Sequence, residues 1–308
     1  MTNNKNLGEP KPVDAATVIL MRDNSQVGIE IFFMQRHHKQ AFMGGMYVFP
    51  GGKLDKEDSV LDLDDHIKGF TFHEAKSLLN EPELDDEVAV GLFVAAIRET
   101  FEESGALMAL RSSGEKIDFS IPEVQICYNE YRKKIHNGEM TMKDLAEKEG
   151  ICFTIDLLTP YAHLITPEGA PKRYNTRFLL AQVPEGQRTI HDSVEMTDSL
   201  WTTASGALEK HYAGEIVLSP PTLMIVEEMS NYSTVDQLLF CISPDNIHTV
   251  LLQHYAKDGE SALLYPHDPD YTIPEFKIQS CPEGKSSRVV LKDGIWRTMC
   301  VEDSDVSK

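Results

Sequence analysis

The segment DDEVAVGLFVAAIRETFEESG, residues 85–105, constrains the fold most, because it predicts one long helix with two chemically opposed faces. The apolar residues that would form its buried stripe are Val90, Phe93, Val94, Ile97 and Phe101. At about 100° per residue, Glu99, Glu102 and Glu103 fall together on the other side, in an arc about 100° wide. Gly105 is well placed to end this helix.

Three neighbouring carboxylates repel one another and destabilise a helix unless something compensates their charge. A divalent cation would do so, since Mg²⁺ in proteins is bound by a few carboxylates, water and substrate phosphates. Arg98 stands four residues before Glu102 and can hold that carboxylate with a charge-assisted hydrogen bond. From the helix alone, a solvated acidic face on an acidic protein stays an open alternative.

The order of the predicted elements indicates an α/β fold with a mixed sheet. The predicted strands are 15–23, 27–36 and 173–183, with a strand end that runs into a helix in 198–215. Further helices are predicted at 70–80, within 123–150 and within 219–242.

The chain divides into three predicted parts. They are a disordered N-terminal tail at 1–13, a main domain at 14–242 and a small C-terminal extension at 243–308. The extension is expected to be rich in strands around proline-rich turns.

The segment FPGGKLD follows a strand-like MYVF, so Gly51 and Gly52 predict a tight turn that brings the backbone close to a ligand. Together with RETFEESG it resembles the signature of the Nudix hydrolases, GX5EX7REUXEEXGU, in which U is aliphatic. The residues that match the second half are Arg98, Glu99, Glu102, Glu103 and Gly105. Thr100 and Ala106 depart mildly from the two U positions.

The first half of the signature departs more. Asp58 stands where the pattern has its first glutamate, and it precedes Arg98 by 40 positions rather than 8. About 32 residues are therefore inserted inside the motif, and segment 59–90, which contains its own predicted helix, can loop out there. With this long insertion, the chain resembles the coenzyme A diphosphatase branch of the Nudix superfamily, which includes a mammalian peroxisomal enzyme.

The resemblance extends to residues 158–178 and 218–230, and it covers roughly 14–240. It implies a Nudix α/β/α sandwich with a mixed β-sheet, a helical insertion within the motif and a small β-rich C-terminal extension. The metal ligands that it implies, for Mg²⁺ or Mn²⁺, are Glu99, Glu102, Glu103 and a backbone carbonyl of Gly51 or Gly52.

The resemblance also implies how a diphosphate would be cleaved. Water attacks one phosphorus and the bridging oxygen leaves, while a carboxylate takes the proton of the water. Glu102 and Arg98 would belong to this catalytic set, with Arg98 orienting a ligand. Glu195 is a candidate for the general base, because its loop faces the site in this branch; a plain surface acid is the alternative.

Substrate-binding residues are predicted in two places. Residues 36–52, which begin with Arg36, partly match an element linked to coenzyme A recognition, although Ala41 stands where that element has arginine. The basic residues Lys172, Arg173 and Arg177 form a compact group that could bind phosphates. Pairing with this protein's many acids is an equally open interpretation of that group.

We therefore expect metal-dependent hydrolysis of a diphosphate in a nucleoside diphosphate derivative. The leading candidate substrate is coenzyme A or acyl-coenzyme A, and its products would be 3′,5′-ADP and (acyl-)phosphopantetheine. ADP-ribose, dinucleotides or nucleotide sugars are the alternative substrates. A non-catalytic nucleotide-binding module is the alternative of another class, and the complete set of Glu99, Glu102 and Glu103 speaks against it.

The composition of the chain limits the kinds of molecule that we expect it to bind. A net charge of −20 argues against non-specific binding of nucleic acid, which relies on basic patches. No run approaches the ~20 apolar residues of a membrane span, and the first residues show no apolar signal region. Five scattered cysteines suit reduced thiols. We thus expect a cytoplasmic enzyme acting on a small-molecule nucleotide without nucleic acid or membrane, and we allow for a homodimer.

Overall fold

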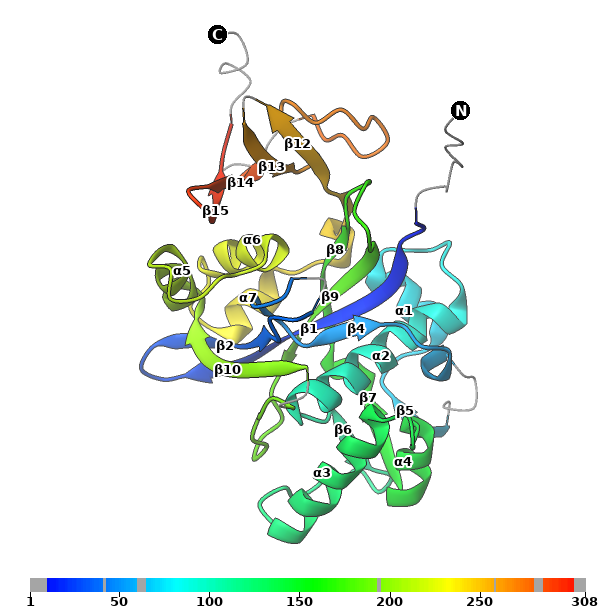
Figure 1. Cartoon of the computed structure of the whole chain (residues 1–308). Coiled ribbons are helices and arrows are strands. Elements are labelled where there is room, and N and C mark those ends of the chain that lie inside the picture. Colours follow the sequence, from blue (N-terminus) through cyan, green and yellow to red (C-terminus); the bar gives the residue numbers. More distant parts are fainter. Residues whose placement is uncertain are drawn as a thin grey trace, which may run out of the picture.

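A mixed eight-stranded sheet forms the centre of the computed structural model, which describes residues 10–40, 43–59, 65–192, 195–257, 259–279 and 285–301 (Figure 1). The strands follow the order β10-β2-β1-β9-β8-β11, with β3 beside β2 and β4 beside β1. They are β1 (Val13–Asn24), β2 (Gly28–Arg36), β3 (Tyr47–Val48), β4 (Gly51–Lys53), β8 (Thr159–Ile165), β9 (Tyr174–Gln182), β10 (Met196–Thr203) and β11 (Thr249–Leu251). Strand β1 runs parallel to β9 and antiparallel to β2, so the sheet is mixed as predicted.

Helices cover both faces of this sheet, because the side chains of its central strands alternate between two apolar cores. Val18 and Leu20 of β1 pack with helix α2 (Asp86–Ser104), whereas Ile19 and Met21 pack with the helices of the other face. Those helices are α5 (Ala204–Tyr212), α6 (Pro220–Met229) and α7 (Val235–Cys241). The predicted α/β/α sandwich is confirmed. No described helix, α2 included, is long and apolar enough to cross a membrane.

A smaller helical layer lies beyond α2. Its elements are β5 (Ile67–Lys68), α1 (Phe72–Leu79), β6 (Ala109–Arg111), α3 (Pro122–His136), α4 (Met142–Glu149) and β7 (Ile151–Thr154). Helix α1 confirms the helix predicted inside the insertion, and it starts with a capping box in which Thr71 and Glu74 bind each other's backbone N–H. The three strands form a separate sheet, β5-β7-β6, that the sequence did not predict.

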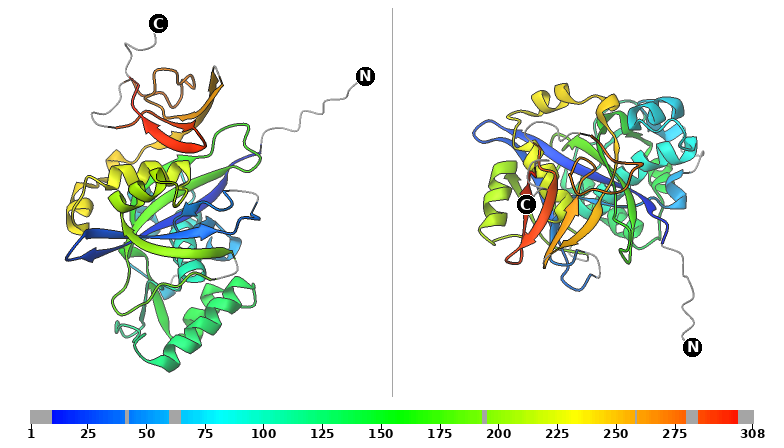
Figure 2. Two further views of the ribbon diagram at one scale, coloured as in Figure 1. Left: turned by 60° about the vertical axis from the view of Figure 1, so that its left-hand side comes forward. Right: turned by 90° about the horizontal axis from the view of Figure 1, so that it is seen from above.

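The C-terminal extension forms a four-stranded antiparallel sheet against α5 and α6 (Figure 2). Its strands are β12 (Gln253–Lys257), β13 (Glu260–Leu264), β14 (Arg288–Lys292) and β15 (Ile295–Met299). The ring of His211 on α5 bonds the carbonyl of Trp296 at 2.8 Å, and Thr298 donates to Glu227 on α6 at 2.6 Å. Since β11 belongs to the central sheet, that sheet continues past the predicted boundary at residue 242.

Some predictions fall outside the described residues. These are most of the tail at 1–13, part of the insertion at 60–64, Ala41 and Cys281. The four described cysteines, Cys127, Cys152, Cys241 and Cys300, are free thiols.

A buried arginine ties the insertion to the central sheet. Arg177 on β9 has a side chain only 3% exposed, and it donates to both carboxylate oxygens of Glu81 at 2.8 and 2.6 Å. Glu81 follows α1, at the end of the insertion, and Arg177 also pairs with Asp14 on β1. These bonds satisfy a guanidinium that would otherwise be buried at a high cost in free energy.

We expect Arg177→Met to lower the free energy of unfolding by about 3 kcal/mol, because it leaves Glu81, whose side chain is only 17% exposed, without its cation. Lys116→Met is the matched control, since Lys116 and Glu185 pair on the surface with side chains 73% and 84% exposed. Its loss should leave the free energy of unfolding unchanged within error, because exposed ion pairs contribute little. Urea unfolding followed by tryptophan fluorescence measures both, and equal losses would contradict the assignment.

Candidate functional site

Helix α2 turns its carboxylates toward the protein interior rather than toward solvent. Glu102 is 8% exposed and Glu103 5% exposed, which contradicts the alternative of a solvated acidic face. Asp85 caps the helix by accepting from the N–H of Glu87. The predicted helix end is confirmed, since Gly105 adopts a left-handed conformation with φ 78°.

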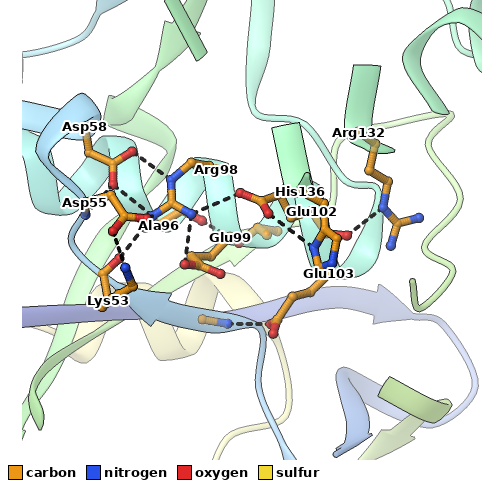
Figure 3. Close-up of polar contacts among 12 residues, drawn as sticks. Lys53, Asp55, Asp58, Ala96, Arg98, Glu99, Glu102, Glu103, Arg132 and His136 are labelled. Carbon is orange, nitrogen blue, oxygen red and sulfur yellow. Dashed lines mark hydrogen bonds and ion pairs between the residues drawn. The ribbon is translucent and has the colours of Figure 1, made fainter. Parts of the chain in front are cut away.

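Arg98 donates hydrogen bonds to three carboxylates at once, and the carboxylate of Asp55 lies 3.6 Å from its guanidinium (Figure 3). One terminal nitrogen donates to Glu99 at 2.9 Å and to Glu102 at 3.0 Å, which confirms the predicted Arg98–Glu102 contact. The other side of the guanidinium donates twice to Asp58, at 2.8 Å each, and once to the carbonyl of Lys53 at 3.0 Å. Asp58, the residue that departs from the signature, is thus a buried partner of Arg98, 3% exposed, despite the insertion that follows it.

The remaining negative charge is poorly compensated. Burial, followed by the charge of Glu102, raises the pKa of Glu99 to about 7 against the opposing effect of Arg98. Burial and the charge of Glu99 raise the pKa of Glu103 well above its usual value, although the N–H of Gly51 donates to Glu103 at 2.8 Å. A site that raises carboxylate pKa values in this way favours the binding of a cation.

The carboxylates fit a hard divalent cation, since they supply oxygen donors that lack full compensation. Within the described residues, no three His, Cys, Asp or Glu side chains are placed so that they could hold a metal ion by themselves. Arg98 engages Glu99 and Glu102, and Gly51 engages Glu103, which leaves further carboxylate oxygens for a metal. Mg²⁺ typically completes its shell with water and substrate phosphates, so an open site of this kind suits it.

The two glycines have a different role from the predicted one. Gly51 and Gly52 lie in strand β4, paired with Thr17 and Ala16 of β1, and neither has a positive φ. Glycine fits at both positions because neighbouring atoms come very close to the backbone. A Cβ on Gly52 would lie 2.2 Å from a carboxylate oxygen of Glu99, and one on Gly51 would lie 2.6 Å from the β1 backbone. The expected tight turn is wrong, but the glycines do admit the carboxylate.

A cavity of about 610 Å³ opens beside these groups. The predicted site residues that line it are Arg36, Gly51, Gly52, Arg98, Glu99, Glu102, Glu103 and Glu195.

The cavity is not lined by the predicted basic group of Lys172, Arg173 and Arg177. Arg177 is buried against Glu81 and Asp14, which favours the alternative of pairing with acids, and Arg173 donates to the carbonyl of Thr166. Side chains alternate along β9, so Arg177 points away from the cavity that its neighbours Thr176 and Phe178 line. Phosphate binding by Lys172 stays a prediction.

Arg36 and Glu195 stand on the wall of the cavity. The Nε of Arg36 is buried and has no hydrogen-bond partner among the described residues, although its charge lowers the pKa of Glu103. Glu195 accepts from Gln40 at 3.4 Å, and its charge contributes to the raised pKa of Glu103. Both side chains can therefore reach a ligand held at the carboxylates.

Helix α3 adds two residues that the sequence did not point to. His136 lines the cavity with its Nδ1 3.5 Å from a carboxylate oxygen of Glu102. Arg132, one turn earlier, donates to the backbone carbonyl of Glu102 at 2.7 Å (Figure 3). The basic run around them has no spacing that would connect it to the acidic helix, so only the tertiary fold reveals the contact.

Comparisons with known proteins agree with this geometry. Residues 12–229 match the family model described as the NUDT19 Nudix domain. The chain is 27% identical to an acyl-coenzyme A diphosphatase NUDT19 of Gallus gallus, over 91% of this chain and 86% of that protein. It is 24% identical to the acyl-coenzyme A diphosphatase NUDT19 of Xenopus laevis, over 89% of this chain and 83% of that protein. A crystal structure of a Nudix hydrolase from Alicyclobacillus acidocaldarius has a TM-score of 0.63 and 24% identity, covering 76% of this chain and 97% of that one, which supports the fold.

The raised carboxylate pKa values predict how stability changes with pH. The folded protein keeps the proton of Glu99 up to about pH 7, whereas the unfolded chain releases it near 4.5, so the metal-free protein should lose stability as pH rises across that window. Glu103→Gln removes one buried charge and still accepts from Gly51. In EDTA at pH 8 we expect its Tm to exceed that of the wild type by ~3 °C or more, with little difference at pH 4.5.

Thermal unfolding with EDTA at the two pH values measures this effect. Glu209→Gln, at an exposed glutamate of α5, is the control and should leave Tm unchanged. A Glu103→Gln variant less stable than the wild type at pH 8 would contradict the account.

Proposed function

Because the chain belongs to the NUDT19 Nudix domain family and is a Nudix hydrolase, we propose that it cleaves the diphosphate of coenzyme A or an acyl-coenzyme A. The products are 3′,5′-ADP and phosphopantetheine or its acyl derivative. The observation that carries this proposal is one cavity lined by Glu99, Glu102 and Glu103 together with a partly unsatisfied Arg36. The acyl-coenzyme A diphosphatase names of the Gallus gallus and Xenopus laevis relatives support the choice of substrate.

The three glutamates of α2 hold Mg²⁺ or Mn²⁺ in this proposal, and a backbone carbonyl of Gly51 or Gly52 is a further candidate ligand. Such an ion neutralises the diphosphate and lowers the pKa of bound water. Arg98 keeps Glu99 and Glu102 in place through the bonds described above.

The other groups of the cavity act on the substrate and on water. Arg36 donates from its guanidinium to a phosphate oxygen, and Glu195 takes the proton from the attacking water. A new phosphorus–oxygen bond forms, and the bond to the bridging oxygen breaks. The cytoplasmic location and the homodimer stay predictions from the sequence.

A substrate panel tests the reaction. Purified protein is incubated with coenzyme A, acetyl-coenzyme A, ADP-ribose, NADH or a diadenosine polyphosphate, with Mg²⁺, Mn²⁺ or EDTA, in ¹⁸O water. We expect 3′,5′-ADP from the coenzyme A substrates only when metal is present, with the label on one product phosphate. Cleavage of the other substrates alone would refute the choice of substrate, and tight binding without any cleavage would indicate a nucleotide sensor.

Two variants test the assigned residues. Glu102→Gln should lower kcat on the order of 100-fold or more, because several kcal/mol of charge stabilisation depend on the metal that it helps to hold. Arg36→Ala should lower kcat/KM by roughly 10- to 100-fold, the effect of losing a charge-assisted hydrogen bond. Arg22→Ala, which removes an arginine outside the cavity, is the control. Full activity of Glu102→Gln would refute the mechanism.

A further inference from the structure

The cavity has a second end that the diphosphate chemistry does not use. Its apolar lining residues there are Leu164, Ile165, Phe178, Pro220, Pro221, Leu252 and Leu263. Leu252 and Leu263 come from the C-terminal extension, beyond the residues 12–229 matched by the family model. Both are largely buried, at 3% and 8% exposed, so they form a fixed wall rather than a mobile rim.

A continuous row of residues connects the two ends across four neighbouring strands. Lys53 of β4 is opposite Ala15 of β1, Ala15 is opposite Thr176 of β9, and Thr176 is opposite Leu164 of β8. All four line the cavity. Three inter-strand spacings separate Lys53 from Leu164, a distance of about 14 Å. The carbonyl of Lys53 is bound by Arg98, so the row starts at the acidic end.

Charge decides which half of a coenzyme A substrate occupies which end. Among the described lining residues, the arginines and lysines are Arg36, Lys53 and Arg98, and all three belong to the acidic end. The 3′,5′-ADP half is highly anionic and suits the end that holds Arg36 and Lys53, while Arg98 stays bound to the carboxylates. The apolar end offers aliphatic walls that suit a hydrocarbon chain, since burying each CH₂ group contributes about 0.8 kcal/mol.

The length of the substrate agrees with this orientation. From the ester oxygen that joins it to the diphosphate to the sulfur, the pantetheine arm has roughly twelve bonds, as many as four residues of extended chain, which span about 14 Å. A diphosphate at the glutamates thus places the thioester beside Leu164, and the acyl group continues toward the C-terminal extension.

We propose that the apolar end of the cavity, walled by Leu252 and Leu263, binds the acyl chain of a fatty acyl-coenzyme A and sets the preferred chain length. This inference rests on the proposed function, because it assigns a place to part of the proposed substrate. It gives the C-terminal extension a direct role in substrate selection.

The test compares kcat/KM for free coenzyme A and for its acetyl, hexanoyl and lauroyl thioesters. Leu263→Trp fills the apolar end, and we expect it to lower kcat/KM for the lauroyl thioester about tenfold or more relative to free coenzyme A. Leu263→Ala enlarges the same end and should shift the preference toward longer chains. Leu291→Trp is the matched control, because Leu291 lies opposite Ser261 in the same sheet, is 40% exposed and does not line the cavity.

The outcomes separate the two proposals. A chain-length profile unchanged by both Leu263 variants, or an equal loss for all four substrates, overturns the acyl site while leaving coenzyme A hydrolysis intact. A wild type that cleaves none of the four refutes the proposed function itself. If Leu263→Trp does not fold, as judged by its Tm, the profile of Leu263→Ala decides.

Discussion

The guanidinium of Arg98 is the interaction on which the site depends. It lies among Asp58, Glu99 and Glu102, and it also binds the carbonyl of Lys53, so it joins the end of β4, the start of the insertion and helix α2. Burial alone would lower the pKa of Arg98, but its bond to Asp58 and the charge of Glu99 raise it above its usual value. One permanent cation therefore keeps the carboxylates apart and in register before any metal binds.

Ion pairs of two buried arginines explain how an insertion inside the motif leaves the site intact. Asp58 stands just before the insertion and binds Arg98, while Glu81 lies near its end and binds the buried Arg177. With both ends held by ion pairs of buried arginines, a longer insertion costs only a loop-closure entropy that grows slowly with length. The aspartate at the position of the signature's first glutamate therefore still binds the signature's arginine, although the sequence spacing between them is lost.

What the sequence predicted well depends on local periodicity. The buried stripe of α2, its end at Gly105 and the Arg98–Glu102 contact all follow from angles within one helix, and the structure contains them. The errors concern partners that are distant in sequence. Arg177 looked like a phosphate ligand because Glu81, 96 positions away, was not known to face it. His136 and Leu263 carry no local signal, since only the packing of α3 and of the C-terminal sheet brings them to the cavity.

The cavity combines two parts with separate origins in the chain. Its acidic end consists of the signature residues on α2 and β4, which tolerate little change because Gly52 touches Glu99 and Arg98 has no spare donor geometry. Its apolar end is assembled from β8, α6 and the C-terminal sheet, where a change of side-chain volume at Leu252 or Leu263 reaches none of the α2 glutamates. Since hydrophobic contacts are non-directional and roughly proportional to area, this end can change its fit to a chain in small steps. On our proposals, this division lets the protein alter its substrate range without disturbing the buried charges of the acidic end.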